Sequence, residues 1–122
     1  MISWTPADLD RYLADDPGGE VVMLNLLRFA PDGGRERCAA YSQSLAPLRE
    51  TYGFHVVYAG DAGTPLVPSG EAWDAVALVR YPDRATFAAM VRDPAYAACE
   101  PLRTAALADS VLQPTVVFGS RS

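Results

Sequence analysis

The nine residues VVMLNLLRF, Val21–Phe29, say more about the fold of this chain than any other segment. It is apolar at odd and even positions alike, although Asn25 and Arg28 lie inside it. A strand with two apolar faces has to be buried on both, so a sheet built on it needs cover on each side. The segment 73–81, WDAVALVRY, has the same character. These two segments are predicted to be the central strands of one sheet.

Cap and turn residues outline the remaining elements. Thr5 followed by Pro6 is typical of a helix start, and Pro47 predicts a kink or break near Ala46. In chain order we expect a helix at about 6–14, a strand at 21–29, a helix at 35–52, strands at 54–60 and 73–81, helices at 84–92 and 95–108, and a strand at 109–118. The loop 61–72 carries prolines and glycines and no pattern of its own.

Without its first helix, this order is strand, helix, strand, strand, helix, strand. It is the pattern of the ferredoxin-like split βαβ fold, an α+β architecture with a four-stranded antiparallel sheet and the helices on one face. In that fold the first and third strands are central. Pro114 falls in the last strand, where an edge position tolerates it. Length and even composition favour a single domain over residues 1–122.

One face of such a sheet stays uncovered by its two long helices. Both faces of the central strands are apolar, and an exposed apolar surface of several hundred Å² is unusual for a monomer. We therefore predict a homodimer in which two sheets pack face to face. The alternative is that the first helix, through Leu9, Tyr12 and Leu13, folds over the open face of a monomer.

Composition excludes several classes of partner. The formal net charge is -5, and the arginines are scattered, so a nucleic-acid partner is not expected. All ten cationic residues are arginine, which excludes Schiff-base catalysis by a lysine. The first residues do not resemble a secretion signal, and no apolar run is long enough for a membrane span, so we expect a cytoplasmic protein without membrane attachment. Cys38 and Cys99 are expected to be buried thiols.

Several short motifs, in a fixed order, carry a resemblance to a known family. They are NLLRF at 25–29, Tyr41, Trp73-Asp74, Tyr81-Pro82-Asp83, DPAY at 93–96 and Arg103. In these motifs the chain resembles the dimeric α+β barrel superfamily and, within it, the domain-of-unknown-function 1330 family. The resemblance implies a dimer with a pocket between each sheet and its helices. The wider superfamily includes cofactor-independent oxygenases, isomerases and haem-degrading enzymes, and fold analogy does not choose among them.

Six side chains are candidate ligand contacts: Asn25, Arg28, Tyr41, Tyr58, Trp73 and Arg103. The amide and the guanidinium inside the first strand need hydrogen-bonding partners if they are buried. The aromatic residues, with Tyr96, combine an apolar ring with a polar tip, and Arg103 can hold a carboxylate with its two-pronged geometry. Competing interpretations are a strand-end salt bridge for Arg28, a cap or backbone bond for Asn25, core packing for the aromatic residues and a surface ion pair with Glu100 for Arg103.

Two residues are candidates for proton transfer. His55 is the sole histidine of the sequence, and histidine is the side chain most often used as a general acid or base, while Tyr41 is the second candidate. The competing interpretation for His55 is an exposed position at a strand end. One histidine without acids at ligand spacing predicts neither a metal site nor a cofactor, although haem ligation by His55 stays open.

Three functions follow. The favoured one is a dimer that binds a small, partly apolar molecule between sheet and helices, an anion if Arg103 holds a carboxylate there. The others are a cofactor-independent oxygenase or isomerase and a purely structural dimerisation module.

Overall fold

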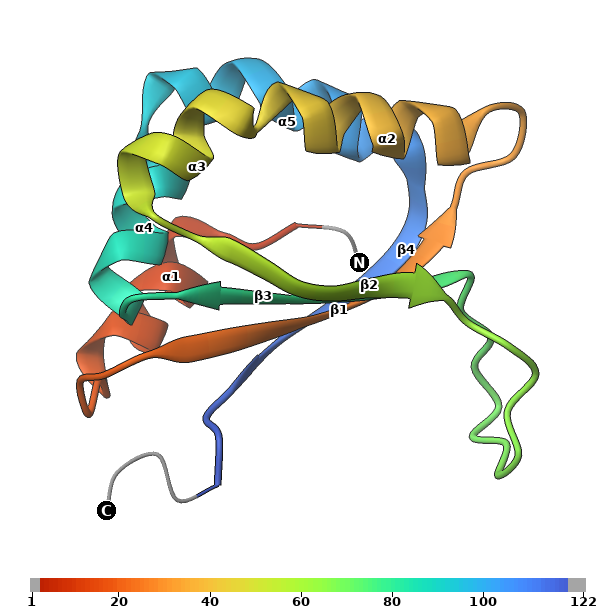
Figure 1. Ribbon diagram of the computed structural model, residues 1–122, viewed down its shortest axis with the longest axis horizontal. Helices are drawn as coiled ribbons and strands as arrows, with labels where there is room; N and C mark the ends of the chain where they lie inside the picture. Colours follow the sequence, from red (N-terminus) through yellow and green to blue (C-terminus); the bar gives the residue numbers. More distant parts are fainter. Residues whose placement is uncertain (1–2, 119–122) are drawn as a thin grey trace.

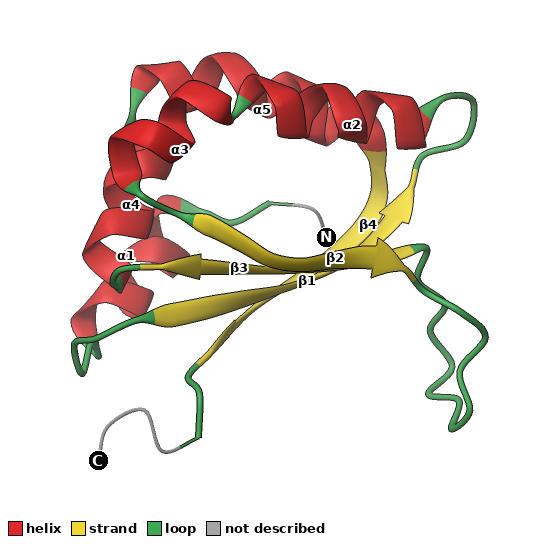
Figure 2. Cartoon of the chain, viewed as in Figure 1, coloured by secondary structure: helices red, strands yellow, loops and turns green. Residues whose placement is uncertain are grey.

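The computed structural model describes residues 3–118, which form one antiparallel sheet and a layer of helices (Figures 1 and 2). In chain order the elements are α1 (Pro6–Ala14), β1 (Val21–Phe29), α2 (Gly34–Ser44), α3 (Ala46–Tyr52), β2 (His55–Asp61), β3 (Ala75–Tyr81), α4 (Arg84–Arg92), α5 (Pro94–Ala106) and β4 (Leu107–Thr115). The predicted ferredoxin-like fold is confirmed.

The strand order across the sheet is β2-β3-β1-β4. The strands with two apolar faces, β1 and β3, are therefore central, as predicted, and Pro114 lies on the edge strand β4. Several boundaries differ from the expected ranges by one to three residues, and two of the differences have a clear structural reason. β3 starts at Ala75 because Asp74 leaves the regular ladder and its carboxylate accepts from the backbone N–H of Phe29 at 2.8 Å. β4 starts at Leu107, two residues early, after a register shift between Arg28 and Phe29.

The two faces of the sheet have different roles. Residues paired across antiparallel strands share a face, so the register assigns every position. Met23, Asn25 and Leu27 of β1 face the helices and line the space beneath them. Val22, Leu24, Leu26 and Arg28 of β1 point to the opposite side, with Val76, Leu78 and Arg80 of β3. We call this second side the outer face.

Helices α2, α3 and α5 lie above one face of the sheet, and α4 and α1 stand at its left end (Figure 1). The predicted long second helix is divided at Leu45 into α2 and α3, and Pro47 stands in the first turn of α3, so the predicted break is confirmed. A proline interrupts a helix because it has no N–H to donate and its ring clashes with the preceding turn. The break lets α3 turn down toward β2 at the end of the sheet (Figure 2).

The first helix does not cover the outer face. α1 begins with a capping box in which the side chains of Thr5 and Asp8 satisfy each other's backbone N–H groups. Its buried Leu9 belongs to the core beneath the helices, and Tyr12 packs edge-on against Phe87 of α4. The alternative that α1 folds over the open sheet is therefore wrong, and the outer face is left half-buried by the chain itself.

Gly34 offers a direct test of the packing between α2 and the end of α5. A Cβ atom at this position would lie 2.7 Å from the carbonyl oxygen of Ala106 and 3.1 Å from the Cβ of Phe29. Because the Ala106 oxygen is a backbone atom and the Phe29 Cβ is bonded directly to the backbone, neither can move aside easily, and Gly34→Ala should destabilise the fold by about 1–3 kcal/mol in urea denaturation.

Gly63 provides the matched control, because a Cβ atom there meets nothing within 4 Å. Gly63→Ala should change the free energy of unfolding by less than about 0.5 kcal/mol. Equal denaturation midpoints for the two variants would contradict the close contact at Gly34.

Candidate functional site

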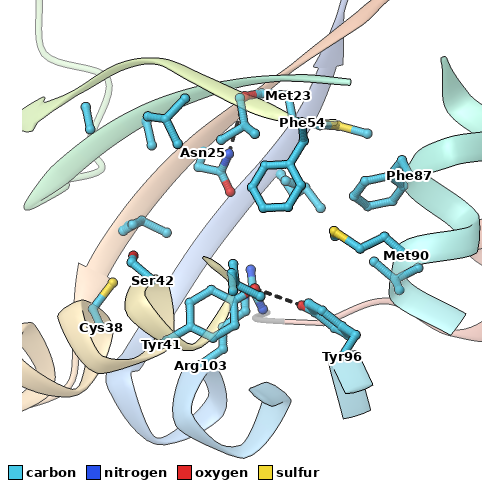
Figure 3. Close-up of a pocket in the computed structure, with 18 of the residues that line it drawn as sticks. Met23, Asn25, Cys38, Tyr41, Ser42, Phe54, Phe87, Met90, Tyr96 and Arg103 are labelled. Carbon is cyan, nitrogen blue, oxygen red and sulfur yellow. Dashed lines mark hydrogen bonds between the residues drawn. The ribbon is translucent and has the colours of Figure 1, made fainter. Parts of the chain in front are cut away.

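A cavity of about 170 Å³ lies between the sheet and the helices (Figure 3). Its walls are mostly apolar and come from β1, β2, β3, β4 and the helices above them. The bulky apolar residues of the lining are Trp4, Met23, Leu27, Leu45, Phe54, Val56, Val79, Tyr81, Phe87, Met90, Val91, Leu107 and Leu112. The resemblance to the dimeric α+β barrel superfamily implies a pocket in this position.

Polar groups gather on the helix side of the cavity. Tyr41 of α2 and Tyr96 of α5 join through their hydroxyl oxygens at 3.0 Å, with the rings edge to face. Arg103, two turns further along α5, is 8% exposed and also lines the cavity. Its guanidinium lies 3.4 Å from the hydroxyl of Ser110 and 6.0 Å from the ring centre of Trp4. Figure 3 shows the polar tips of Tyr41, Tyr96 and Arg103 directed toward one another.

Burial sets the protonation of the two hydroxyls. Desolvation raises the pKa of Tyr41, and the contact with Tyr96 raises it further, whereas the charge of Arg103 opposes the shift. Desolvation also raises the pKa of Tyr96, opposed by its hydrogen bond to Tyr41 and by Arg103. Both residues therefore keep their protons at neutral pH. They can donate hydrogen bonds to a ligand, but they are poor bases.

The cavity is positively charged within a negatively charged protein. Arg49 and Arg103 both contribute to its lining. Among the residues that the structure describes there, no aspartate, glutamate or histidine takes part. Since low-dielectric walls concentrate the field of the charges they hold, this arrangement favours an anion inside.

Asn25 is the polar residue on the sheet side. Its side-chain nitrogen donates to the backbone carbonyl of Met23 at 3.3 Å. The amide therefore directs its oxygen away from the strand, and Figure 3 shows that oxygen pointing into the cavity. Asn25 and Arg28 lie on opposite faces of the sheet, as the alternation of the strand predicts. Asn25 is on the side of the helices.

The structure brings together only three of the six predicted ligand contacts, Asn25, Tyr41 and Arg103. Arg103 is buried and does not lie on the surface, where the competing interpretation placed it. Tyr58 is paired with Leu78, points to the outer face and is 54% exposed, so its predicted place in the pocket is wrong.

Arg28 and Trp73 also lie outside the cavity. The Arg28 guanidinium sits 5.0 Å from the centre of the Trp73 ring and 3.1 Å from a carboxylate oxygen of Glu71, and it approaches Asp109 at 3.6 Å. The competing interpretation of Arg28 as a strand-end salt bridge therefore describes this structure. Trp73 packs with it at the exit of the loop before β3.

His55 lies at the exposed start of β2, opposite Arg80 on the outer face. Of the two residues predicted for proton transfer, only Tyr41 lines the cavity. Over residues 3–118, no group of three or more histidine, cysteine or carboxylate side chains is arranged to hold a metal ion. Within the same residues, every helix is too short or too polar to cross a bilayer.

Trp4 and Arg49 are among the lining residues that were not predicted from the sequence. Trp4 directly precedes the cap Thr5, and Leu9 is the fourth helical residue, a spacing typical of a hydrophobic staple that packs the chain before a helix onto the core. That signal was available in the sequence. Arg49 had no such signal, because its place depends on the turn of α3 after the helix break.

The comparisons with known proteins agree with this architecture. The model of the domain of unknown function DUF1330 matches residues 33–115. The RPA0582 protein of unknown function from Rhodopseudomonas palustris is 34% identical, with a TM-score of 0.86 and 96% of each chain covered. A dimeric ferredoxin-like protein of unknown function from Jannaschia sp. CCS1 is 16% identical, with a TM-score of 0.65, and the alignment covers 81% of this chain and all of that one.

An enzyme also shares the fold. A hydroxynitrile lyase from Passiflora edulis is 11% identical, with a TM-score of 0.65, covering 85% of this chain and 98% of the lyase. At that identity the likeness concerns the fold alone. No curated protein is similar enough to count as a match.

Proposed function

The chain belongs to the DUF1330 family, and we propose that it binds a small, partly apolar organic anion in the cavity between its sheet and its helices. The observation that carries this proposal is the buried Arg103 beside the Tyr41–Tyr96 hydroxyl pair. These groups would hold a carboxylate or another oxyanion by charge-assisted hydrogen bonds. The rest of the wall would enclose its apolar part.

The size and lining of the cavity limit the kinds of ligand that can bind in it. An engineered protein cavity of about 150 Å³ admits one benzene molecule, so about 170 Å³ has room for one ring or a short chain. Phe54, Tyr81 and Phe87 form a run of aromatic contacts in the wall, with ring centres 5.5 and 5.1 Å apart. Aromatic walls of this kind favour a planar apolar body.

Binding is favoured over catalysis by the protonation of the site. A cofactor-free isomerase or oxygenase would need a base to remove a proton from its substrate. The tyrosines are protonated, and the described lining offers no carboxylate or imidazole as an alternative. The favoured function is therefore that of a binding protein.

A thermal-shift series tests the proposal. Benzoate, benzyl alcohol and benzylamine share one ring and differ in charge. A ligand that binds the native protein stabilises it by about 2.7 kcal/mol at a hundred times its Kd, which raises the Tm by several degrees. Benzoate should raise the Tm, benzyl alcohol should raise it less, and benzylamine should leave it unchanged. If small carboxylates at millimolar concentration leave the Tm unchanged, the anion site is not there.

We also propose that the outer face is covered by a second copy of this chain. Its centre consists of Val22, Leu24, Leu26, Val76 and Leu78, which the chain's own helices leave half-buried. Solved structures with the same fold are described as dimeric, which supports a second copy as the occupant. Light scattering after size exclusion should give twice the chain mass of 13.1 kDa at micromolar concentration.

A further inference from the structure

The cavity has walls of opposite hydrogen-bonding character. On the helix side stand donors: the guanidinium of Arg103 and the Tyr41–Tyr96 pair. In that pair one hydroxyl donates to the other, so one of the two hydrogens is left for a ligand. Both hydroxyls are held in the neutral form by burial, which preserves this donor at neutral pH.

The sheet side offers an acceptor. The side-chain nitrogen of Asn25 is engaged by the carbonyl of Met23, and none of the described residues donates a hydrogen bond to its side-chain oxygen. That oxygen is also not fully buried, because Tyr12 holds the sole unpartnered buried side-chain polar atom of the described residues. It is an open carbonyl acceptor directed into an apolar space (Figure 3).

From these two walls we infer that the ligand is a hydroxy-substituted aromatic carboxylate. This inference rests on the proposed function and names the ligand class for the same site. The carboxylate lies at the donors of α2 and α5, and a hydroxyl at the far side of the ring donates to the oxygen of Asn25. An acceptor at the sheet wall repels a second anionic or carbonyl group there, so the far group has to carry a hydrogen.

The ring between the two polar ends fits the remaining walls. Phe54, Tyr81 and Phe87 supply aromatic faces and edges, and Met23 and Met90 fill the space around them. A flexible aliphatic hydroxy acid would lose more rotational freedom on binding than a planar ring does. The lining therefore favours the aromatic member of this class.

Isothermal titration calorimetry with four probes separates the contribution of the carboxylate to the binding affinity from the contribution of the hydroxyl. Benzoate tests the anion site alone, and 4-hydroxybenzoate and 3-hydroxybenzoate add a donor at two positions. The fourth, 4-methylbenzoate, adds similar bulk to the para position without a donor. Because a neutral hydrogen bond contributes about a 2- to 12-fold change in affinity, at least one hydroxybenzoate should bind more tightly than benzoate by that factor, and 4-methylbenzoate should not.

Asn25→Leu keeps a similar volume and removes the acceptor. In this variant the ratio of the benzoate Kd to the hydroxybenzoate Kd should fall to about 1. Gln43→Leu is the control, since it removes an exposed amide on α2 that does not line the cavity, and the ratio should stay as in the unaltered protein. Thermal denaturation of each unliganded variant shows whether it is folded.

The binding results distinguish a failure of the proposed function from a failure of the proposed ligand class. If neither benzoate nor a hydroxybenzoate binds, the proposed function and this inference both fail. If all four probes bind equally well, the anion site stands and the ligand class is wrong. If the preference for a hydroxyl persists in folded Asn25→Leu, Asn25 is not the acceptor and the inference is overturned.

Discussion

Arg103→Met should raise the Kd for benzoate by about 10- to 150-fold. The side chain is buried in the wall of the cavity, and a hydrogen bond to a charged group contributes about 1.5–3 kcal/mol. Methionine fills comparable length without charge or donors. The same substitution should leave the binding of uncharged benzyl alcohol nearly unchanged, because that ligand has no anionic group for Arg103 to hold. Calorimetry with both ligands measures the difference.

Arg49→Met is the matched control for this prediction. Arg49 also lines the cavity, but its side chain is exposed, and solvent screens its charge. Its loss should raise the Kd for benzoate only about 2- to 5-fold at physiological salt. Arg103 also touches Ser110 and Trp4, so the melting temperature of each variant has to be measured. A folded Arg103→Met protein that binds benzoate normally would remove the basis of the proposed function.

The architecture was predictable because its signals are local and strong. A strand apolar on both faces needs cover on each side, which placed β1 and β3 correctly at the centre of the sheet. A proline in the middle of a long helical pattern removes a backbone hydrogen bond and favours a break, which occurs before Pro47, whereas Pro101 is accommodated inside α5. Arg103 was singled out because a guanidinium can hold a carboxylate with its two-pronged geometry, and it does lie in the cavity wall.

The placement of side chains at the sheet edges was not predictable in this way. His55 and Tyr58 are three residues apart and would point to opposite faces in a regular strand. The register shift between Val56 and Tyr58 puts both on the outer face. Arg28 shows a second feature that the sequence does not determine. The alternation of β1 places Arg28 and Asn25 on opposite sides of the sheet, but it does not show which of the two residues lies on the side of the helices. That choice is made by the packing of α2, α4 and α5 on the sheet.

The outer face yields the second large prediction. Leu24→Glu places a carboxylate in the middle of the proposed interface, where Leu24 is paired with Leu78 on one side and Gln113 on the other. Two copies related by a twofold axis would each bury this charge without a partner, which costs several kcal/mol per ion. Light scattering should therefore report a change from twice the chain mass to 13.1 kDa.

A glutamate introduced on the helix layer is the control, because it shows whether added charge alone, rather than its position on the outer face, separates the two copies. Ala39 is an exposed residue of α2, so Ala39→Glu adds the same charge on the opposite side of the molecule. This variant should remain a dimer. Because the cavity lies between sheet and helices and is built from one chain, monomeric Leu24→Glu should still bind benzoate if it stays folded. A monomeric unaltered protein, or a Leu24→Glu variant that remains dimeric, would show that the apolar outer face is not where two copies meet.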